Sequence, residues 1–279
     1  MPQPMDTFLI TLTPRQLPAL QGWSAGRGWR SIPALLAYRL GPGPHLLRAD
    51  NASLPRGALM VVGDRGFDGL GHTSAVCQEI LQECQSRGFS GAILDFEGRI
   101  PPLEQIAARL DGPFAQRGLA LYVSEWYGAA APHAQVMIPS SLSGGSLRQR
   151  LEEARERFGR DRVVLALERV AEDFFLPSPT GSGQPLSPEQ LARLMDRLEP
   201  AVFFSGELCA RYFTYMSRET GAHFVLFDDE DTLRCKLEVA RSLSIHTFLA
   251  PWAEVADCAA GLGIRHSSPV AGRATSSAR

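Results

Sequence analysis

The chain has 279 residues, of which 44% are hydrophobic and 21% are charged, and its formal net charge at pH 7 is -2. This composition is typical of a globular protein with enough apolar residues for one large core. The near-neutral charge and the absence of a basic run interleaved with aromatic residues argue against nucleic acid as a partner.

Targeting, membrane and metal signals are absent from the sequence. Residues 1–13 lack the basic start and the long apolar stretch of a signal peptide, and no run approaches the roughly 18 apolar residues of a membrane span. The five cysteines include no CxxC pair, and the six histidines show no metal-ligand spacing. We therefore expect reduced thiols, no metal, no cofactor, and a cytoplasmic or spore-associated setting.

Apolar strands alternate with amphipathic helices through the first 170 residues or so. We expect strands at residues 7–12, 34–40, 58–62, 91–97, 119–123, 135–138 and 162–167. We expect helices at residues 73–87, 103–116 and 147–158, where apolar side chains recur at helical spacing.

The pattern changes after residue 170. Residues 171–188 are rich in proline and glycine and indicate an excursion loop. Ser187 and Pro188 are typical of a helix start, and that helix should reach about residue 198. We expect the remaining elements to be short strands at 201–204 and 223–227, a helix at 231–243, a last strand at 245–250, and a disordered tail at 263–279.

This order of elements predicts an α/β fold. Strands that alternate with helices are joined as parallel strands by right-handed crossovers, and strands that are apolar on both faces belong to a sheet covered on both sides. About eight such units in about 260 residues fit a (β/α)8 TIM barrel better than an open sheet. We therefore predict one barrel domain over residues 1–262, with an excursion between the seventh and eighth strands.

Acidic residues follow several of the expected strands. In a barrel of this type the functional site lies at the C-terminal ends of the strands. The acids at those ends are Asp64, Asp95, Glu97, Glu125 and Glu168. Their common location favours a functional site over solvated acids scattered at strand-loop junctions.

Asp95 and Glu97 stand two residues apart, so on a continuous strand their side chains share one face. Two carboxylates that repel each other at the end of a buried strand raise the pKa of at least one of them. A general acid needs such a raised pKa at neutral pH.

Residues 88–97, Gly-Phe-Ser-Gly-Ala-Ile-Leu-Asp-Phe-Glu, resemble the fourth-strand motif DGxDxDxE of the chitinase-type family 18 glycoside hydrolases. Glu97 matches the catalytic acid of the family, Asp95 matches the aspartate that orients the acetamido group of the substrate, and Gly91 matches the motif glycine. Val-Leu-Phe-Asp-Asp at 225–229, followed by Leu233 and Lys236, resembles a second family segment. The likeness spans residues 58–256 and is greatest to the spore-associated, cortex-degrading branch.

The sequence departs from the family pattern at four positions. The earlier motif aspartates are replaced by Ser90 and Ile93. The Met-x-Tyr-Asp motif of the sixth strand aligns with Met137-Ile-Pro139-Ser140, which lacks the tyrosine that holds the acetamido oxygen. Tyr122 or Tyr127 could supply that hydroxyl from a neighbouring strand.

The resemblance implies a retaining hydrolase of N-acetylglucosamine-containing glycans, chitin or peptidoglycan, in which the N-acetyl oxygen of the substrate is the nucleophile. Glu97 would be the general acid/base, and Asp95 would stabilise the cationic intermediate. Trp252 matches the tryptophan at the floor of the family's sugar site, while Trp126 is either a stacking residue or packed against the barrel rim. The further substrate-binding candidates are Tyr122, Tyr127, Glu125, Glu168 and Asp64.

Two alternatives stay open. Glu97 and Glu168, or Glu97 and Glu125, could form the acid and nucleophile of a two-glutamate retaining glycosidase, which requires carboxyl groups about 5 to 5.5 Å apart. A catalytically inactive sugar-binding or structural barrel is favoured by Ile93, Pro139 and Ser140.

Overall fold

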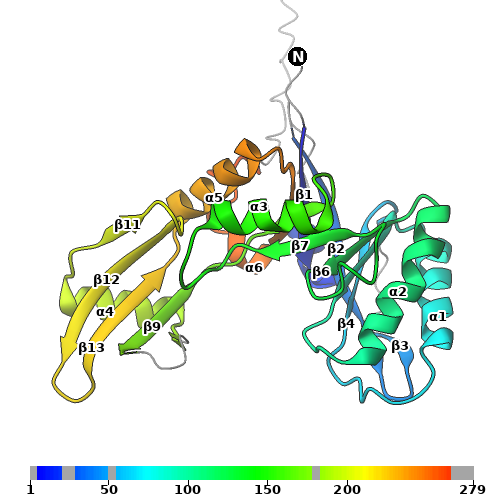
Figure 1. The fold of residues 1–279 in the computed structure, drawn as a ribbon, viewed down its shortest axis with the longest axis horizontal. Coiled ribbons are helices and arrows are strands. Elements are labelled where there is room, and N and C mark those ends of the chain that lie inside the picture. The colour runs from blue at the N-terminus through cyan, green and yellow to red at the C-terminus, as the bar shows by residue number, and fades with distance from the viewer. Residues whose placement is uncertain (1–4, 21–28, 50–54, 178–182, 265–279) are drawn as a thin grey trace, which may run out of the picture.

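The computed structural model describes residues 5–20, 29–49, 55–177 and 183–264. Its main feature is a closed barrel of eight parallel strands (Figure 1). The ring closes because β1 (Asp6–Leu12) pairs in parallel with both β2 (Trp29–Gly41) and β14 (Thr247–Pro251). Between them lie, in ring order from β2, β4 (Leu59–Gly63), β5 (Gly91–Asp95), β6 (Ala120–Ser124), β7 (Gln135–Pro139) and β8 (Val163–Ala166). The predicted TIM barrel is confirmed.

The barrel strands are apolar on both faces because both faces are buried. One face fills the barrel interior with a cluster that contains Leu9, Val61, Ile93, Tyr122 and Met137, among others. The alternate side chains point outward and join the larger core beneath the helices. Ile93, at a position where the family motif has an aspartate, therefore packs inside the barrel.

The helices lie outside the strands. They are α1 (Thr73–Arg87), α2 (Pro101–Gln116), α3 (Leu147–Phe158), α5 (Glu230–Ser242) and the short α6 (Trp252–Val255), with a 3-10 helix η1 (Pro14–Leu20) after β1. After β2 the chain returns in the antiparallel strand β3 (His45–Arg48) instead of a helix. The helices expected at 73–87 and 147–158 have the predicted bounds, and those expected at 103–116 and 231–243 are displaced by at most two residues.

Glycines determine how the chain enters β5. Gly88 ends α1 in the left-handed conformation with φ 70°, which glycine adopts without strain. Gly91 then opens β5 so close to β6 that a Cβ atom would clash with the backbone of Ala120. The glycine of the motif is thus required by the packing of two barrel strands.

The excursion between the seventh and eighth barrel strands is a small layer of its own. It consists of β9 (Ala171–Leu176), β10 (Gln184–Pro185), α4 (Pro188–Leu198), β11 (Phe203–Ser205), β12 (Ala210–Ser217) and β13 (Gly221–Phe227). The strands form an antiparallel sheet in the order β10-β9-β13-β12-β11, which we call the inserted sheet. It lies beside the barrel, with α4 packed on one face (Figure 1).

The excursion was predicted, but its content was not. The expectation of a loop over residues 171–188 is wrong, because β9 and β10 occupy part of that range. The sequence also did not indicate β12 as a strand. Short turns join β12 to its partners β11 and β13. Antiparallel pairing satisfies the backbone hydrogen-bonding groups of β12, although its side chains show no clear alternation of apolar and polar residues.

The expectation that all five cysteines are reduced is wrong for two of them. Cys209, just before β12, forms a disulfide with Cys235 in α5, with the Cα atoms 5.7 Å apart. Cys77, Cys84 and Cys258 are free and buried. The two bonded cysteines are 26 residues apart and meet only because the inserted sheet folds back onto α5, so the sequence spacing could not reveal them. Cysteine chemistry therefore no longer supports an intracellular setting.

Replacing both disulfide cysteines, Cys209→Ala with Cys235→Ala, should lower the free energy of unfolding by about 3 kcal/mol, since the bond restricts a loop of this length in the unfolded chain. Urea denaturation of the oxidised wild type and the double variant measures the loss. Reduction of the wild type with dithiothreitol should produce a similar decrease. A midpoint that does not change with either treatment would contradict the bond.

Two further sequence expectations concern the C-terminal tail and membrane-spanning segments. Residues 265–279, most of the expected tail, lie outside the described residues. Among the residues that the structure describes, none of the helices combines the length and the apolar character needed to cross a membrane.

Candidate active site

Four carboxylates gather at the C-terminal mouth of the barrel. Asp95 is the last residue of β5, Glu97 follows it, Asp64 follows β4, and Glu168 follows β8. The pKa of Asp95 is raised above its usual value, mainly by loss of hydration and then by the negative charges of Glu97, Asp64 and Glu168. Asp95 keeps an exposed surface at the mouth, but protein atoms crowd its other sides, which explains why desolvation dominates.

The loop that carries Glu97 is held from both sides. Strand β5 ends at Asp95, two residues earlier than expected, so Glu97 stands in the loop before α2 and not on the strand face. The Asp64 carboxylate accepts hydrogen bonds from the backbone N–H groups of Glu97, at 3.2 Å, and Gly98, at 2.8 Å. The Tyr127 hydroxyl donates to the Gly98 carbonyl, and its ring meets Phe96 edge-on at 6.0 Å. Asp64 and Tyr127 thus act on the backbone that positions Glu97.

The burial of Tyr127 favours a structural role for its hydroxyl group. Its side chain is buried and its pKa is raised to about 12 by burial, with smaller contributions from Asp64 and Glu104. The hydroxyl is therefore protonated at neutral pH and available as the donor to Gly98. The two loops after β5 and β6 are joined by this bond.

The two residues before Tyr127 have different partners. The Glu125 carboxylate forms an ion pair with Arg150 of α3. Trp126 is 50% exposed, and the guanidinium carbon of Arg99 lies 3.2 Å from its ring centroid. Trp126 therefore stands at the open rim with one ring face covered by an arginine.

Tyr122 lies in the barrel interior beside Ile93, its partner in the register of β5 and β6. Burial raises the pKa of Tyr122, and Arg30 partly opposes the shift. Arg30 belongs to the N-terminal part of β2, where its side chain bonds Thr7 at the start of β1. The Tyr122 hydroxyl therefore interacts electrostatically with Arg30, a cation near the opposite end of the barrel from Asp95.

The residues that replace the sixth-strand motif connect β7 to β8. Ser140 is fully buried, and its hydroxyl accepts from the N–H of Glu168 at 3.0 Å and donates to the carbonyl of Glu168 at 3.3 Å. Ser141 donates to the Glu168 carboxylate at 2.7 Å. Ser140, which stands at the position of the motif aspartate, and Ser141 thus orient Glu168.

A buried ion pair lies where the chain leaves the barrel and returns. The Lys236 ammonium group lies 2.5 Å from the Asp228 carboxylate, and both side chains are shielded from solvent. Lys236 also donates to the Glu168 carbonyl, and Asp228 accepts from the N–H of Val170. Burial lowers the pKa of Lys236, while Asp228 opposes the shift. A lysine among the apolar positions of α5, with Leu233 and Leu237, was the signal for this pair.

Trp252 follows β14 as the first residue of α6 and is partly buried against the outer core. Its position at the end of the eighth barrel strand is the one that the family resemblance implied. Within the described residues, no group of three or more His, Cys, Asp or Glu side chains could hold a metal ion.

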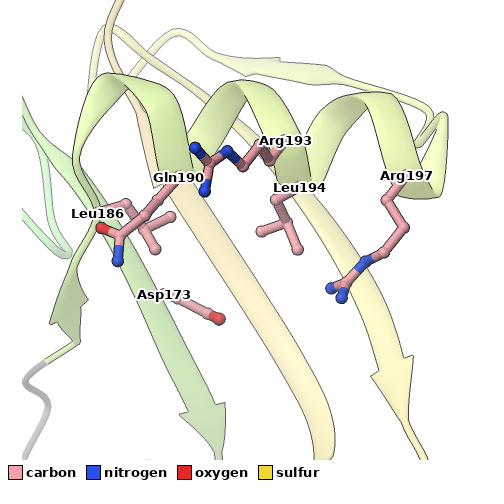
Figure 2. Close-up of a pocket in the computed structure, with 6 residues that line it drawn as sticks. All are labelled: Asp173, Leu186, Gln190, Arg193, Leu194 and Arg197. Carbon is pink, nitrogen blue, oxygen red and sulfur yellow. The ribbon is translucent and has the colours of Figure 1, made fainter.

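A separate cavity of about 310 Å³ lies between α4 and the inserted sheet (Figure 2). It is lined by Asp173, Leu186, Gln190, Arg193, Leu194 and Arg197. Asp173 accepts from the Tyr215 hydroxyl and also pairs with His223, which anchors this part of the inserted sheet. None of the lining residues belongs to the barrel mouth.

Asp95→Asn should stabilise the fold at neutral pH. An aspartate with a raised folded-state pKa contributes its full stability below the unfolded-state pKa and loses it as the pH rises through the raised value. We expect the variant to exceed the wild type at pH 7 by up to about 1 kcal/mol, after allowance for solvent screening, and to match it below about pH 4. Urea denaturation at both pH values measures the difference. Equal stability at pH 7 would contradict the cost of ionising Asp95 at this mouth.

Comparisons with known proteins rest on structure alone. No family model matches the chain, and no curated protein matches it. Among solved structures, the spore cortex-lytic enzyme SleL of Bacillus megaterium superposes with a TM-score of 0.63 at 15% identity, covering 90% of this chain and 71% of that one.

Two chitin-related structures are similarly close. A chitinase from Chromobacterium violaceum has a TM-score of 0.61 at 16% identity, covering 88% of this chain and 94% of that one. A glycoside hydrolase family 18 N-acetylglucosaminidase from Paenibacillus barengoltzii has a TM-score of 0.61 at 14% identity, covering 88% and 95%. The chain therefore has the barrel fold of chitinase-type and spore cortex-lytic enzymes, in agreement with the family 18 resemblance of residues 88–97.

Proposed function

We propose that this protein is a glycoside hydrolase that cleaves N-acetylglucosamine-containing glycans, of the chitin or peptidoglycan type, with Glu97 as general acid/base. The observation that carries the proposal is the placement of Asp95 and Glu97 at the end of the fourth barrel strand, where loss of hydration and then the neighbouring carboxylates raise the pKa of Asp95. The fold supports it, because chitinases and an N-acetylglucosaminidase share this barrel.

The reaction proceeds in two steps. Glu97 donates a proton to the glycosidic oxygen while the N-acetyl oxygen of the substrate attacks the anomeric carbon, so that the leaving sugar departs as an alcohol. Asp95 stabilises the positive charge of the resulting oxazolinium ion. Glu97, now a carboxylate, then removes a proton from the water that opens this ring and restores the sugar with retained configuration.

The raised pKa of Asp95 keeps a proton available at the mouth. Because loss of hydration and the charges of Glu97, Asp64 and Glu168 disfavour ionisation of Asp95, this residue holds its proton to a higher pH than an isolated aspartate would. The family aspartate two residues before Asp95 is Ile93 here, which packs in the barrel interior and offers Asp95 no carboxyl group as a hydrogen-bond partner. Trp252 is the candidate for contact with an apolar sugar face, and Trp126 can offer only the ring face that Arg99 leaves uncovered.

The direct test is turnover of a chitin hexamer. We expect the wild type to release shorter oligomers, detected by mass spectrometry, with the β anomer formed first in the NMR spectrum. A thiazoline analogue of the oxazolinium ion should inhibit. Release of the α anomer first would exclude the retaining mechanism, and no product from chitin or peptidoglycan strands would exclude hydrolysis.

The two-glutamate alternative is favoured by the position of Glu168. Its carboxylate is oriented by Ser141 at the end of the seventh barrel strand and influences the pKa of Asp95. In that mechanism a fluorinated glycoside would leave a covalent sugar on Glu168, and the thiazoline would not inhibit. Intact-protein mass spectrometry after incubation distinguishes the two mechanisms.

The inactive-barrel alternative is favoured by Ile93, Pro139 and Ser140, which occupy positions of family catalytic residues. Such a barrel would bind the oligomer without cleaving it. Isothermal titration calorimetry with the chitin hexamer, run beside the turnover assay, identifies this outcome.

A further inference from the structure

Arg99 stands at the acidic mouth and has no carboxylate partner among the residues that the structure describes. Arg99 lies two residues after Glu97, and its side chain is exposed. Its guanidinium carbon is 3.2 Å from the centroid of the Trp126 ring, a separation that only a parallel stack allows. Although Asp64, Asp95, Glu97 and Glu168 stand at the same mouth, Arg99 forms no hydrogen bond or ion pair with any residue that the structure describes.

The stack is anchored on both sides. The loop of Arg99 is held by the bonds from Glu97 and Gly98 to Asp64, and it is joined to the loop of Trp126 by the bond from Tyr127 to Gly98. Because these bonds hold Gly98, next to Arg99, and Tyr127, next to Trp126, they restrict the positions of the two stacked side chains. An arginine held in this way loses less side-chain entropy when it binds a ligand.

Stacking leaves the chemistry of the guanidinium edge available. The Trp126 ring covers the flat face, while the N–H donors lie in the guanidinium plane and point outward. That fork matches the two oxygens of a carboxylate. The surrounding acids repel any anionic ligand, so a positioned cation is what such a ligand would require at this mouth.

We propose that Arg99, stacked on Trp126, binds a carboxylate of the glycan and selects N-acetylglucosamine-containing strands whose neighbouring sugars carry a carboxylate, as N-acetylmuramic acid does, over neutral chitin. This inference rests on the proposed function for its choice of glycan. Trp126 acts as the support of Arg99, and its covered face is not the sugar-stacking surface in this arrangement.

The test is a binding experiment in a Glu97→Gln background, which prevents turnover. Three tetrasaccharides are titrated by calorimetry: an N-acetylglucosamine tetramer, an alternating N-acetylglucosamine/N-acetylmuramic acid strand with free carboxylates, and the methyl ester of that strand. We expect Arg99→Gln to weaken binding of the free acid about tenfold or more, and to change binding of the two neutral probes less than about threefold. Arg99→Lys should fall between, because it keeps the charge and loses the fork.

Arg65→Gln is the matched control. It removes the same charge from the exposed loop after β4, beside Asp64. We expect it to affect all three probes alike and weakly. An equal loss with Arg65→Gln and Arg99→Gln, an equal loss on all three probes, or no binding of the free acid would overturn the proposal.

Turnover by the wild type distinguishes failure of the proposed hydrolase activity from failure of the proposed carboxylate site. Arg99-dependent preference for the free acid without any cleavage would reject the hydrolase and keep the carboxylate site. Cleavage of the acid and neutral strands in a ratio that Arg99→Gln leaves unchanged would reject the carboxylate site and keep the hydrolase.

Discussion

Glu97→Gln is expected to lower kcat on N-acetylglucosamine oligomers by about 10²- to 10⁴-fold, because a glutamine neither donates the proton to the leaving oxygen nor removes one from water. Asp64 and Tyr127 hold the backbone of this loop and not the Glu97 side chain, so the substitution leaves the loop in place. Oligomer affinity should therefore change little. Reducing-end release and calorimetry measure the two quantities.

A control variant tests whether the loss of kcat is specific to Glu97. Glu156→Gln, an exposed position on α3, makes the same chemical change away from the mouth and should leave kcat unaltered. If Glu97→Gln keeps wild-type turnover, Glu97 is not the general acid. If neither the wild type nor Glu97→Gln cleaves the oligomer while both bind it, the barrel is a binding protein.

Lys236→Met is expected to lower the free energy of unfolding by about 3 to 5 kcal/mol, because it leaves the buried carboxylate of Asp228 without its counter-charge. Lys236 is the only lysine in the chain, and it also donates to the Glu168 carbonyl. One Asp228 oxygen already has no hydrogen-bond partner within the described residues, so the remaining charge would be poorly compensated. Urea denaturation at pH 7 measures the loss.

The double variant Lys236→Met/Asp228→Asn tests the cause. Without the buried charge, most of the lost stability should return, to within about 1 to 2 kcal/mol of the wild type. Arg234→Met on the same helix is the control, since its ion pairs with Glu230 and Asp231 are exposed and should contribute less than about 1 kcal/mol. If the double variant is no more stable than Lys236→Met, the loss arises from packing and not from charge.

The ion pair also links stability to the candidate active site. Lys236 and Ser140 both bond the backbone of Glu168, and Asp228 bonds the backbone of Val170 two residues later. The segment that leaves the barrel for the inserted sheet is therefore fixed by three side chains. A variant that loosens it should displace the Glu168 carboxylate from the mouth.

Much of the barrel could be predicted because its determinants are local. Apolar runs such as residues 58–62 and 119–123 form strands buried on both faces, and helical spacing of apolar residues placed α1 and α3 to the residue. The antiparallel excursion was harder. Strand β12 has a mixed sequence whose stability depends on its neighbours β11 and β13, and pairing between strands does not show in the period of one segment.

The sequence by itself determined the order of the eight barrel strands and of the helices between them, and with it the position of Asp95 and Glu97 at the end of the fourth barrel strand, because periodicity and chain order are properties of each segment. Only the tertiary structure decided what surrounds that stretch. Contacts between residues far apart along the chain, from Asp64 to Glu97, Arg99 to Trp126, Cys209 to Cys235 and Glu168 to Lys236, exist because barrel closure and the inserted sheet bring separate segments together.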